Sequence, residues 1–223
     1  GATLVFDHDG NQVDLLPNTI SAATQGKQNS HLKSSATHGS KVVTMITLSG
    51  GSGDPITAFQ IWDLTKSTPS EKLISTVYLP GQDFAADGIS MSDSHIFVGD
   101  SWTDFAGQNR GSVYVLDYSG NTVRIIDGPR SKGGFGGFVS FDHNTDELII
   151  VETTNALYPN YSPKVHIYDS TGENKLREFD IPLTEDSRLN IGTDAQQIAV
   201  YNGSLFYMFH GSFGEMVGAP NKY

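Results

Sequence analysis

The sequence predicts an all-β fold assembled from antiparallel hairpins, and three observations support this prediction. Residues alternate between two faces at period two over short segments, and tight-turn signals such as Ser-Gly separate these segments. The resulting hairpins recur along the chain at a nearly constant spacing. Helical periodicity does not persist beyond about one turn. The 24 glycines and the low charged fraction of 17% agree with a turn-rich β protein.

One type of hairpin ends its first strand in an aspartate. In the segment GSVYVLDYSGNTVRIIDG, alternation leads up to Asp117, and Tyr-Ser-Gly-Asn supplies the reversal. The four hairpins of this type are Ala2 to Leu16, Thr57 to Leu79, Gly111 to Gly128 and Pro163 to Ile181. Their aspartates, Asp7, Asp63, Asp117 and Asp169, follow one another at intervals of 56, 54 and 52 residues. The chain is therefore expected to contain a structural repeat of this length.

A second type of hairpin precedes three of these and occurs once more near the C-terminus. Its copies are Leu32 to Leu48, Asp87 to Asp100, Gly137 to Glu152 and Ala195 to Phe209. In the first three copies the first apolar residue after the turn, Val42, Ile96 or Leu148, stands 21 residues before the next aspartate. This constant separation indicates that the two hairpins form one rigid unit. Such a four-stranded antiparallel sheet, repeated about every 54 residues, is the blade expected of a β-propeller.

The repeat predicts about four blades in a single β-propeller domain that spans residues 1–223. The hairpin 2–16 corresponds to the second half of a blade, and the hairpin 195–209 corresponds to the first half. We expect these terminal hairpins to pair into one blade and close a ring. The alternative is that the chain forms an arc of a larger propeller.

The charge and composition exclude several kinds of partner and site. The 14 basic and 25 acidic residues give a net charge of -11, which repels phosphate backbones, so no nucleic-acid partner is expected. No apolar run approaches the ~18 residues of a membrane span. The absence of cysteine excludes disulfides and thiol catalysis, so stability must come from the core. We expect an extracellular, cell-surface or virion location.

Two consecutive segments resemble the FG-GAP repeats of integrin-α-like propellers, which are also familiar from bacterial surface proteins and virion proteins of marine phages. In that family a Phe-Gly pair opens the blade, an acidic loop joins its first two strands, and a Val-Gly-Ala-Pro-like corner follows. The segments Phe135 to Gly136, Phe138 to Ser140 and Asp142 to Asp146 match best, and Val98 to Ser101 is similar to the corner. The resemblance covers about two well-matching repeats and two degraded ones. It implies a propeller fold and a surface, structural or adhesive role.

The acidic loop contains a candidate metal site. Asp142, Asn144 and Asp146 stand at positions one, three and five, a spacing that lets alternate oxygens converge on calcium. However, Glu147 stands where the family has glycine, and Ile150 stands where it has its last acidic ligand. The alternative is an ordinary hairpin turn in which these side chains bond their own backbone. We expect no cofactor other than calcium.

The loops that join strands two and three of a blade open on the face where propellers usually bind ligands. Two of these loops, residues 99–110 and 152–162, are long and rich in aromatic and polar side chains. The candidate ligand-binding residues are Trp102, Asp104, Phe105, Asn109, Arg110, Tyr158 and Tyr161. Aromatic faces stack on sugar rings or apolar side chains, and neighbouring carboxylates and amides orient hydroxyl groups. The alternative is that the aromatics cap the core at the blade ends.

Two classes of function are compatible with these features. The favoured one is a non-catalytic surface module, structural or adhesive, that binds a glycan or a protein surface, alone or within a larger assembly. The alternative is a glycan-active hydrolase or lyase with a cleft at the propeller axis and Asp100, Asp104 or Glu152 as acid and base. The histidines are spread over turns, a loop and one strand, which carries His166, and are not expected to converge.

Overall fold

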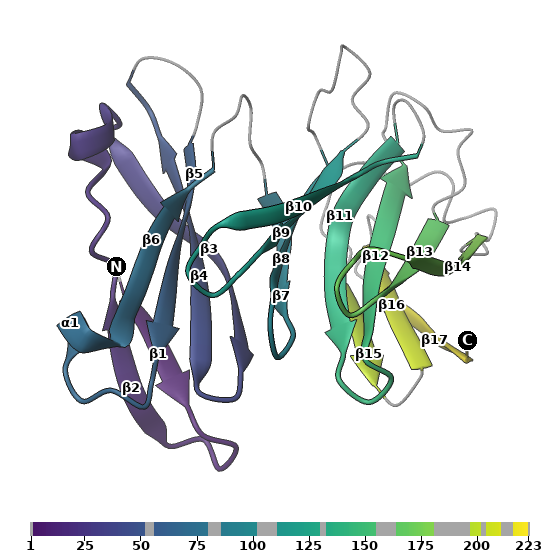
Figure 1. Cartoon of the computed structure of the whole chain (residues 1–223), viewed down its shortest axis with the longest axis horizontal. Helices are drawn as coiled ribbons and strands as arrows, with labels where there is room; N and C mark the ends of the chain where they lie inside the picture. Colours follow the sequence, from purple (N-terminus) through teal and green to yellow (C-terminus); the bar gives the residue numbers. More distant parts are fainter. Residues whose placement is uncertain are drawn as a thin grey trace. The chain divides into compact units, whose positions relative to one another are not determined.

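The computed structural model describes residues 2–51, 56–79, 86–101, 111–129, 133–154, 164–180, 197–201, 204–210 and 216–222, the last three ranges as backbone. The chain divides into two compact units, drawn together in Figure 1. One unit comprises Gly1–Phe84 with Tyr118–Gly120, and the other comprises Ala85–Asp117 with Asn121–Tyr223. Among the described residues, no helix has the length and hydrophobicity needed to cross a membrane.

The first unit contains two antiparallel sheets. A two-stranded sheet consists of β1 (Ala2–Phe6) and β2 (Gln12–Pro17), and a 3-10 helix, η1 (Ala22–Gln25), follows it. The four-stranded sheet has the order β3 (Asn29–His38), β4 (Lys41–Ser49), β5 (Ile56–Asp63) and β6 (Leu73–Tyr78). A single helical turn, α1 (Pro69–Lys72), precedes β6 and is capped by Thr68.

The second unit contains two four-stranded sheets and one three-stranded sheet. The first has the strands β7 (Ala86–Met91), β8 (Ile96–Asp100), β9 (Ser112–Leu116) and β10 (Thr122–Asp127) in sequential order. The second has the strands β11 (Gly133–Asp142), β12 (Glu147–Thr154), β13 (Lys164–Asp169) and β14 (Lys175–Asp180). The third has the strands β15 (Gln197–Tyr201), β16 (Ser204–His210) and β17 (Met216–Lys222).

The three four-stranded sheets confirm the repeat that the sequence predicted. Each sheet is an antiparallel meander built from the two predicted types of hairpin. Val42 pairs with Trp62, Ile96 with Leu116 and Leu148 with Tyr168, so the second and third strands share one register in all three sheets. This register explains the constant separation of 21 residues. In each sheet the recurring aspartate comes directly after the third-strand residue that pairs with Val42, Ile96 or Leu148. One such meander per repeat is the blade architecture of β-propellers.

The pairing of the terminal hairpins that the sequence predicted is not detected in the described sheets. In the described sheets, β16 pairs with β15 on one edge and with β17 on the other. Among the described strands, β1 pairs with β2. The pairing of β16 with β17 requires a connection of only five residues, 211–215, and short loops cost little conformational entropy. Ring closure is not detected among these sheets.

An aspartate at the end of the third strand builds the following turn, which explains why this residue recurs. Asp7 Oδ1 accepts the backbone N–H of Asn11 at 2.8 Å, and its Oδ2 accepts the side-chain amide at 3.1 Å. Asp117 binds Asn121 in the same way, at 2.8 and 2.9 Å. Asp63 and Asp169 accept hydroxyl hydrogen bonds from Thr65 and Thr171 at 2.7 and 2.8 Å. The carboxylate thus fixes the turn that sets the hairpin register.

Each fourth strand begins with a β-bulge that exposes an apolar side chain. In all four hairpins of this type the register shifts near the start of the fourth strand, and one residue is left without a partner in the pairing. The unpaired residues are Val13, Ile74, Val123 and Leu176. Their exposed fractions lie between 41% and 57%.

Neighbouring sheets within a unit pack face to face. In the first unit Leu16 of β2 packs against Val42 and Trp62. In the second unit, residues of β8 and β9 pack against residues of β11 and β12; this core includes Phe97, Val113, Val115, Phe135, Leu148 and Ile150.

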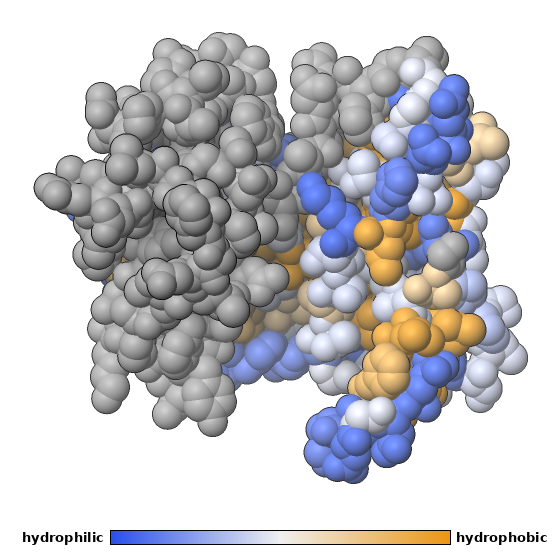
Figure 2. Space-filling view, turned by 180° about the vertical axis from the view of Figure 1, so that it is seen from behind, coloured by the Kyte–Doolittle hydropathy of each residue, from blue (hydrophilic) through white to orange (hydrophobic). Residues whose placement is uncertain are grey.

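The opposite face of the β1–β2 sheet is not covered in this way. Leu4, Phe6, Val13 and Leu15 are each more than half exposed. Figure 2 shows this part of the first unit from behind, with hydrophobic side chains along the projecting hairpin and hydrophilic ones at its turn. A two-stranded sheet is marginally stable in isolation, so β1–β2 depends on its packing against β3–β6.

Candidate functional site

The loop residues predicted to bind ligand lie outside the described part of the chain. These residues are Trp102, Asp104, Phe105, Asn109, Arg110, Tyr158 and Tyr161. The strands that carry the two loops are described. One loop connects β8 to β9, and the other connects β12 to β13.

The strand ends that carry these loops lie next to each other in the second unit. A Cβ atom added to Gly136 of β11 would lie 2.6 Å from the carbonyl oxygen of Ser112 and 3.2 Å from the backbone nitrogen of Asp100. Those two residues flank the first loop. Phe135, beside Gly136, pairs with Glu152 at the end of β12, just before the second loop. Both loops therefore leave the sheets at the same end.

The glycine run 133–137 allows this close approach. Gly136 has a φ of +83°, a backbone conformation that residues other than glycine rarely adopt. Gly136 and Gly137 form a two-residue bulge, because Phe135 pairs with Glu152 and Phe138 pairs with Val151. The bulge brings β11 so close to β8 that its carbonyl at Gly136 would lie 2.0 Å from a Cβ at Gly99.

The two described carboxylates that were candidates for acid–base chemistry are buried. Asp100 is 1% exposed and Glu152 is 0% exposed. Glu152 Oε2 lies 2.9 Å from Nε2 of His166, whose side chain is 1% exposed. The other ring nitrogen, Nδ1, lies 3.4 Å from Oε2 of Glu178 on β14. The ring of Phe135 meets the imidazole edge-on at a centroid distance of 5.1 Å.

Two lysines form ion pairs with Glu178, the partly exposed carboxylate of this group. Glu178 accepts hydrogen bonds from Lys175 at 2.7 Å and from Lys164 at 3.2 Å. These two bonds lower the pKa of Glu178 to about 2, against a smaller opposing effect of burial. The same contact with Glu178, followed by one with Asp180, raises the pKa of Lys164. These side chains, called the charged cluster below, join the three strands β12, β13 and β14. They are Glu152, His166, Glu178, Lys164 and Lys175.

The buried part of this cluster has little access to solvent. Both imidazole nitrogens of His166 face carboxylates, and its side chain has almost no contact with solvent. A general acid or base must reach the proton it transfers at a hydrogen-bonding distance, directly or through one water. Glu152 and His166 make their contact near the end of β12, where the second loop begins.

The candidate calcium loop forms a hairpin turn. Asp142 is 2% exposed, and its Oδ1 accepts the backbone N–H of Asn144 at 2.9 Å. Asp146 has a φ of +57°, the left-handed conformation of a tight turn. Glu147, in place of the family's glycine, pairs with Arg177 at 2.7 and 2.9 Å. Over the described ranges, no group of three or more acidic, histidine or cysteine side chains is arranged to hold a metal ion.

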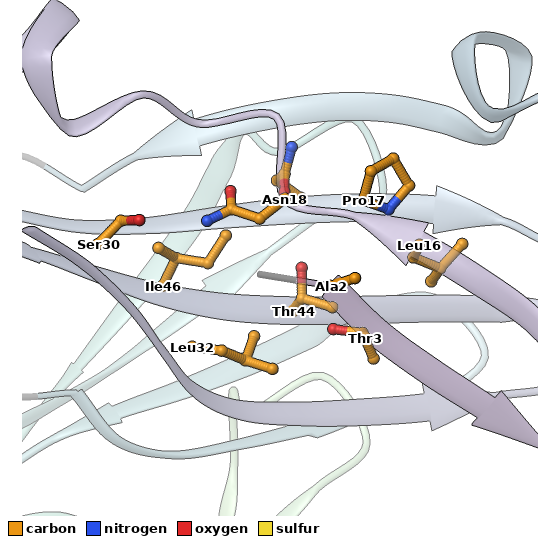
Figure 3. Close-up of a pocket in the computed structure, with 10 residues that line it drawn as sticks. Ala2, Thr3, Leu16, Pro17, Asn18, Ser30, Leu32, Thr44 and Ile46 are labelled. Atoms are coloured by element: carbon orange, nitrogen blue, oxygen red, sulfur yellow. The ribbon is translucent and has the colours of Figure 1, made fainter.

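A pocket lies in the first unit between the β1–β2 hairpin and the sheet β3–β6 (Figure 3). Its polar lining consists of Thr3, Asn18, Ser30, Thr44 and Gln60, and its apolar walls include Leu16, Leu32 and Ile46. The pocket has a cavity volume of about 30 Å³. Trp62 Nε1 donates to Thr44 Oγ1 at 3.4 Å, and Gln60 Nε2 donates to Thr19 Oγ1.

The pocket and the charged cluster occupy the same place in the repeat. Ile46, Asp100 and Glu152 each stand four residues after the first apolar residue of the second strand. Gln60, Tyr114 and His166 are equivalent on the third strand, because they pair with Thr44, Val98 and Ile150. Leu32, Ala86 and Phe135 are equivalent on the first strand and pair with Ile46, Asp100 and Glu152.

Comparisons with known proteins give only distant similarity in fold. No family model matches the sequence, and no curated protein matches it. The β-propeller domain of the Trilobed protease from Pyrococcus furiosus is similar with a TM-score of 0.49 and 12% identity, over 86% of this chain and 53% of that one. An acylaminoacyl peptidase in complex with Z-Gly-Gly-Phe-chloromethyl ketone gives 0.47 and 12%, over 91% and 34%. The Pyrococcus horikoshii acylaminoacyl peptidase gives 0.46 and 13%, over 90% and 34%. The chain thus spans about half of the first structure and about a third of the other two.

Sequence reasoning did not connect His166 with Glu152. The two residues are 14 positions apart, on adjacent strands, and do not pair directly in the register. An alignment of the three repeats on Val42, Ile96 and Leu148 carries the signal, because it places Glu152 and His166 where other blades have Ile46 and Gln60.

Proposed function

We propose that this protein is a non-catalytic binding module whose loops 99–110 and 152–162 contact a glycan or a protein surface. The observation that carries this proposal is the burial of Asp100 and Glu152, at 1% and 0% exposure. The alternative, a glycan-active hydrolase or lyase, requires an acid and a base that touch the substrate. The pairing of Glu152 with His166 favours a role in holding the loop base instead.

The shared origin of the two loops supports a single binding face. Their flanking strand ends, near Asp100 and Glu152, are brought together by the close contact at Gly136. Trp102 and Tyr158 supply aromatic faces for stacking on sugar rings or apolar side chains. Asp104, Asn109 and Arg110 supply hydrogen-bonding groups for orientation.

A glycan-array screen of the purified protein, with and without calcium, tests this function. We expect a bound glycan class or protein ligand whose affinity falls at least tenfold in a Trp102→Ala, Tyr158→Ala double variant. Tyr78→Ala is the matched control, because Tyr78 is an exposed aromatic residue of the first unit. Cleavage of a glycan by the protein, abolished in Glu152→Gln, would instead establish the enzyme.

We also infer that another β-sheet covers the exposed face of β1–β2, through ring closure or in a larger assembly. The exposed Leu4, Phe6, Val13 and Leu15 support this inference, because the other face of the same sheet is packed. Light scattering coupled to size exclusion distinguishes the two cases. A Leu4→Lys, Leu15→Lys variant should shift an assembly to the monomer mass, whereas it should destabilise a closed monomer without changing its mass.

A further inference from the structure

Strand β1 exposes side chains whose equivalents in the neighbouring sheet are buried. Counted back from the recurring aspartate, Phe6 is equivalent to Trp62, and Leu4 is equivalent to Gln60. Phe6 and Leu4 are 54% and 52% exposed, whereas Trp62 and Gln60 are each 1% exposed. Trp62 is buried against the preceding sheet, where Leu16 packs on it. The exposed face of β1 therefore corresponds to a face that meets a preceding sheet.

The outer strand β2 does not show this difference. Its residues Val13 and Leu15 are 57% and 51% exposed. Their equivalents on β10, Val123 and Ile125, are 51% and 49% exposed although β10 belongs to a complete four-stranded sheet. Exposure of this pair is thus a common property of the outer strands. The feature that calls for a partner lies on β1.

The turn after β1 lacks a contact that an equivalent turn makes. Gly10 and Gly172 each stand three residues after a recurring aspartate. A Cβ atom added to Gly172 would lie 2.8 Å from Cδ1 of Ile126 on the preceding sheet. A Cβ atom added to Gly10 would have no described atom within 4 Å. Both the face and the turn of this hairpin therefore fit a preceding sheet, and no described sheet of the first unit covers them.

The sheet β15–β17 of the second unit lacks a neighbour on its other side. Its strand β15 lies beside β11, and no described sheet of this unit follows it in the chain. Phe206 of β16 is equivalent to Phe97, because each comes directly after the first apolar residue of a second strand. Phe97 is fully buried and stacks on Phe141 of the following sheet at a centroid distance of 5.7 Å. The aromatic residue at the same position of β16 predicts a following sheet here as well.

The strands at both ends suit a contact between two copies of an acidic chain. The chain has a net charge of -11, but β1, β15, β16 and β17 contain no acidic residue. Asp14 of β2 is paired with Lys72 at 2.6 Å. Apolar strands without carboxylates can meet without desolvating a charge and with less repulsion than other acidic surfaces. The turn after β1 adds Asp9, and β17 ends at Lys222, so the charges beside the two surfaces have opposite signs.

We propose that the exposed face of β1 and its turn bind the sheet β15–β17 of a second copy of the chain, head to tail. The proposal rests on the inference that another β-sheet covers β1–β2, and it assigns that sheet and the molecule that supplies it. Each unit has one sheet that lacks a neighbour, and a second copy provides the layer that the unit does not hold. The contact is heterologous, because the two copies use different surfaces.

Light scattering coupled to size exclusion, over a wide range of concentrations, tests the proposal by complementation. Phe6→Lys places an ammonium group in the contact from one side, and Phe206→Lys does so from the other. Each variant alone should associate about tenfold more weakly than the wild type. An equimolar mixture retains one intact pair of surfaces and should form a dimer with one copy of each variant. A mixture that stays monomeric would overturn the proposal.

A control and a second tail variant make the test specific. Val123→Lys should leave association unchanged, because Val123 is an exposed apolar residue of an outer strand. Circular dichroism checks that each variant is folded. If Phe206→Lys unfolds, Met208→Lys replaces it, since Met208 lies two residues further along β16.

The same measurements separate this proposal from the inference on which it rests. A wild-type protein that is monomeric at every concentration and is destabilised by Phe6→Lys would show that its own chain covers the face. That result would overturn the second copy and keep the covered face. If Phe6→Lys changed neither the mass nor the stability, both would be wrong. Glycan binding by the loops 99–110 and 152–162 is measured separately and does not depend on either result.

Discussion

One position of the repeat holds a neutral pocket in the sheet β3–β6 and a closed charged cluster in the sheet β11–β14. Gln60 and Ile46 occupy this position in the first case, and His166 and Glu152 occupy it in the second. The first-strand residue differs as well, because Leu32 is 47% exposed whereas Phe135 is fully buried against the imidazole. The shared register fixes the backbone of a blade and leaves the chemistry of this face to three side chains.

A difference in the first-strand bulge accompanies the change. In β3 the register shifts by one residue between Leu32 and Ser34, whereas in β11 it shifts by two residues between Phe135 and Phe138. The longer bulge presses β11 against Ser112 and Asp100 of the neighbouring sheet. In the sheet β11–β14, close packing against the neighbouring sheet therefore accompanies the buried contact of Phe135, Glu152 and His166.

The largest expected effect comes from breaking the charged cluster. His166→Met leaves the Glu152 carboxylate buried without the imidazole that lies 2.9 Å away. A buried carboxylate that loses its hydrogen-bonding partner costs about 4 kcal/mol. Urea unfolding followed by circular dichroism measures the change. A loss below about 1 kcal/mol in unfolding free energy would show that His166 contributes no more to stability than Gln60 of the pocket does.

The bulge glycine should rank second. Gly136→Ala places a Cβ 2.6 Å from the carbonyl oxygen of Ser112 at a φ of +83°, so steric overlap adds to backbone strain. We expect a loss of about 3 kcal/mol in the free energy of unfolding. Gly10→Ala is the matched control, since Gly10 has a φ of +84° with no atom within 4 Å of its Cβ, and should lose about 1 kcal/mol. Equal losses would mean that the close approach of the sheets is not tight.

The turn aspartates make the stability of the fold depend on pH. Burial alone raises the pKa of Asp169, but the hydrogen bonds from Asn174, Thr171 and Glu173 outweigh it and bring the pKa to about 2. Because this value lies below the 3.8 of an unperturbed aspartate, the carboxylate stabilises the fold above about pH 4. That contribution is lost as the pH falls from about 4 to about 2.

Asp169→Asn should therefore cost about 1 kcal/mol at pH 7 and less at pH 2, as measured by urea unfolding at both values. Asp7→Asn should show the same direction with a smaller amplitude, because the hydrogen bonds that lower the pKa of Asp7 lie at the exposed turn. A cost that does not change with pH would contradict the role of the carboxylate charge.

The smallest effect should come from the pocket. Gln60 occupies the position equivalent to His166, and Gln60→Met introduces the same side chain. It removes a neutral amide whose Oε1 accepts no hydrogen bond from the described residues. We expect a change below about 1 kcal/mol in unfolding free energy. A loss as large as that of His166→Met would show that Gln60 carries more of the structure than its contacts indicate.

Most of the blade framework could be predicted from the sequence, because local features encode it. Alternation gives the strands, and the aspartate and asparagine of the turns, such as Asp117 and Asn121, give the hairpins. The separation of 21 residues gives the register between them. The same arithmetic predicted that the terminal hairpins pair, and this pairing is not detected in the described sheets, where β16 pairs with β15 and β17.

The contents of the candidate sites were less accessible from the sequence. Glu152 and His166 meet through a contact between strands that only an aligned register predicts. The pocket depends on how the hairpin carrying Leu16 rests on Thr44 and Gln60, which is a matter of side-chain packing rather than pattern. The loop residues Trp102 and Tyr158 remain predictions.

The bulges at the start of the fourth strands have a consequence for solubility. A regular outer strand would offer a straight row of free N–H and C=O groups onto which an unrelated chain could stack as a growing fibril. Val13, Ile74, Val123 and Leu176 interrupt that row once in each hairpin. The bulge beside each exposed apolar residue therefore makes the outer edge a poorer template for such stacking.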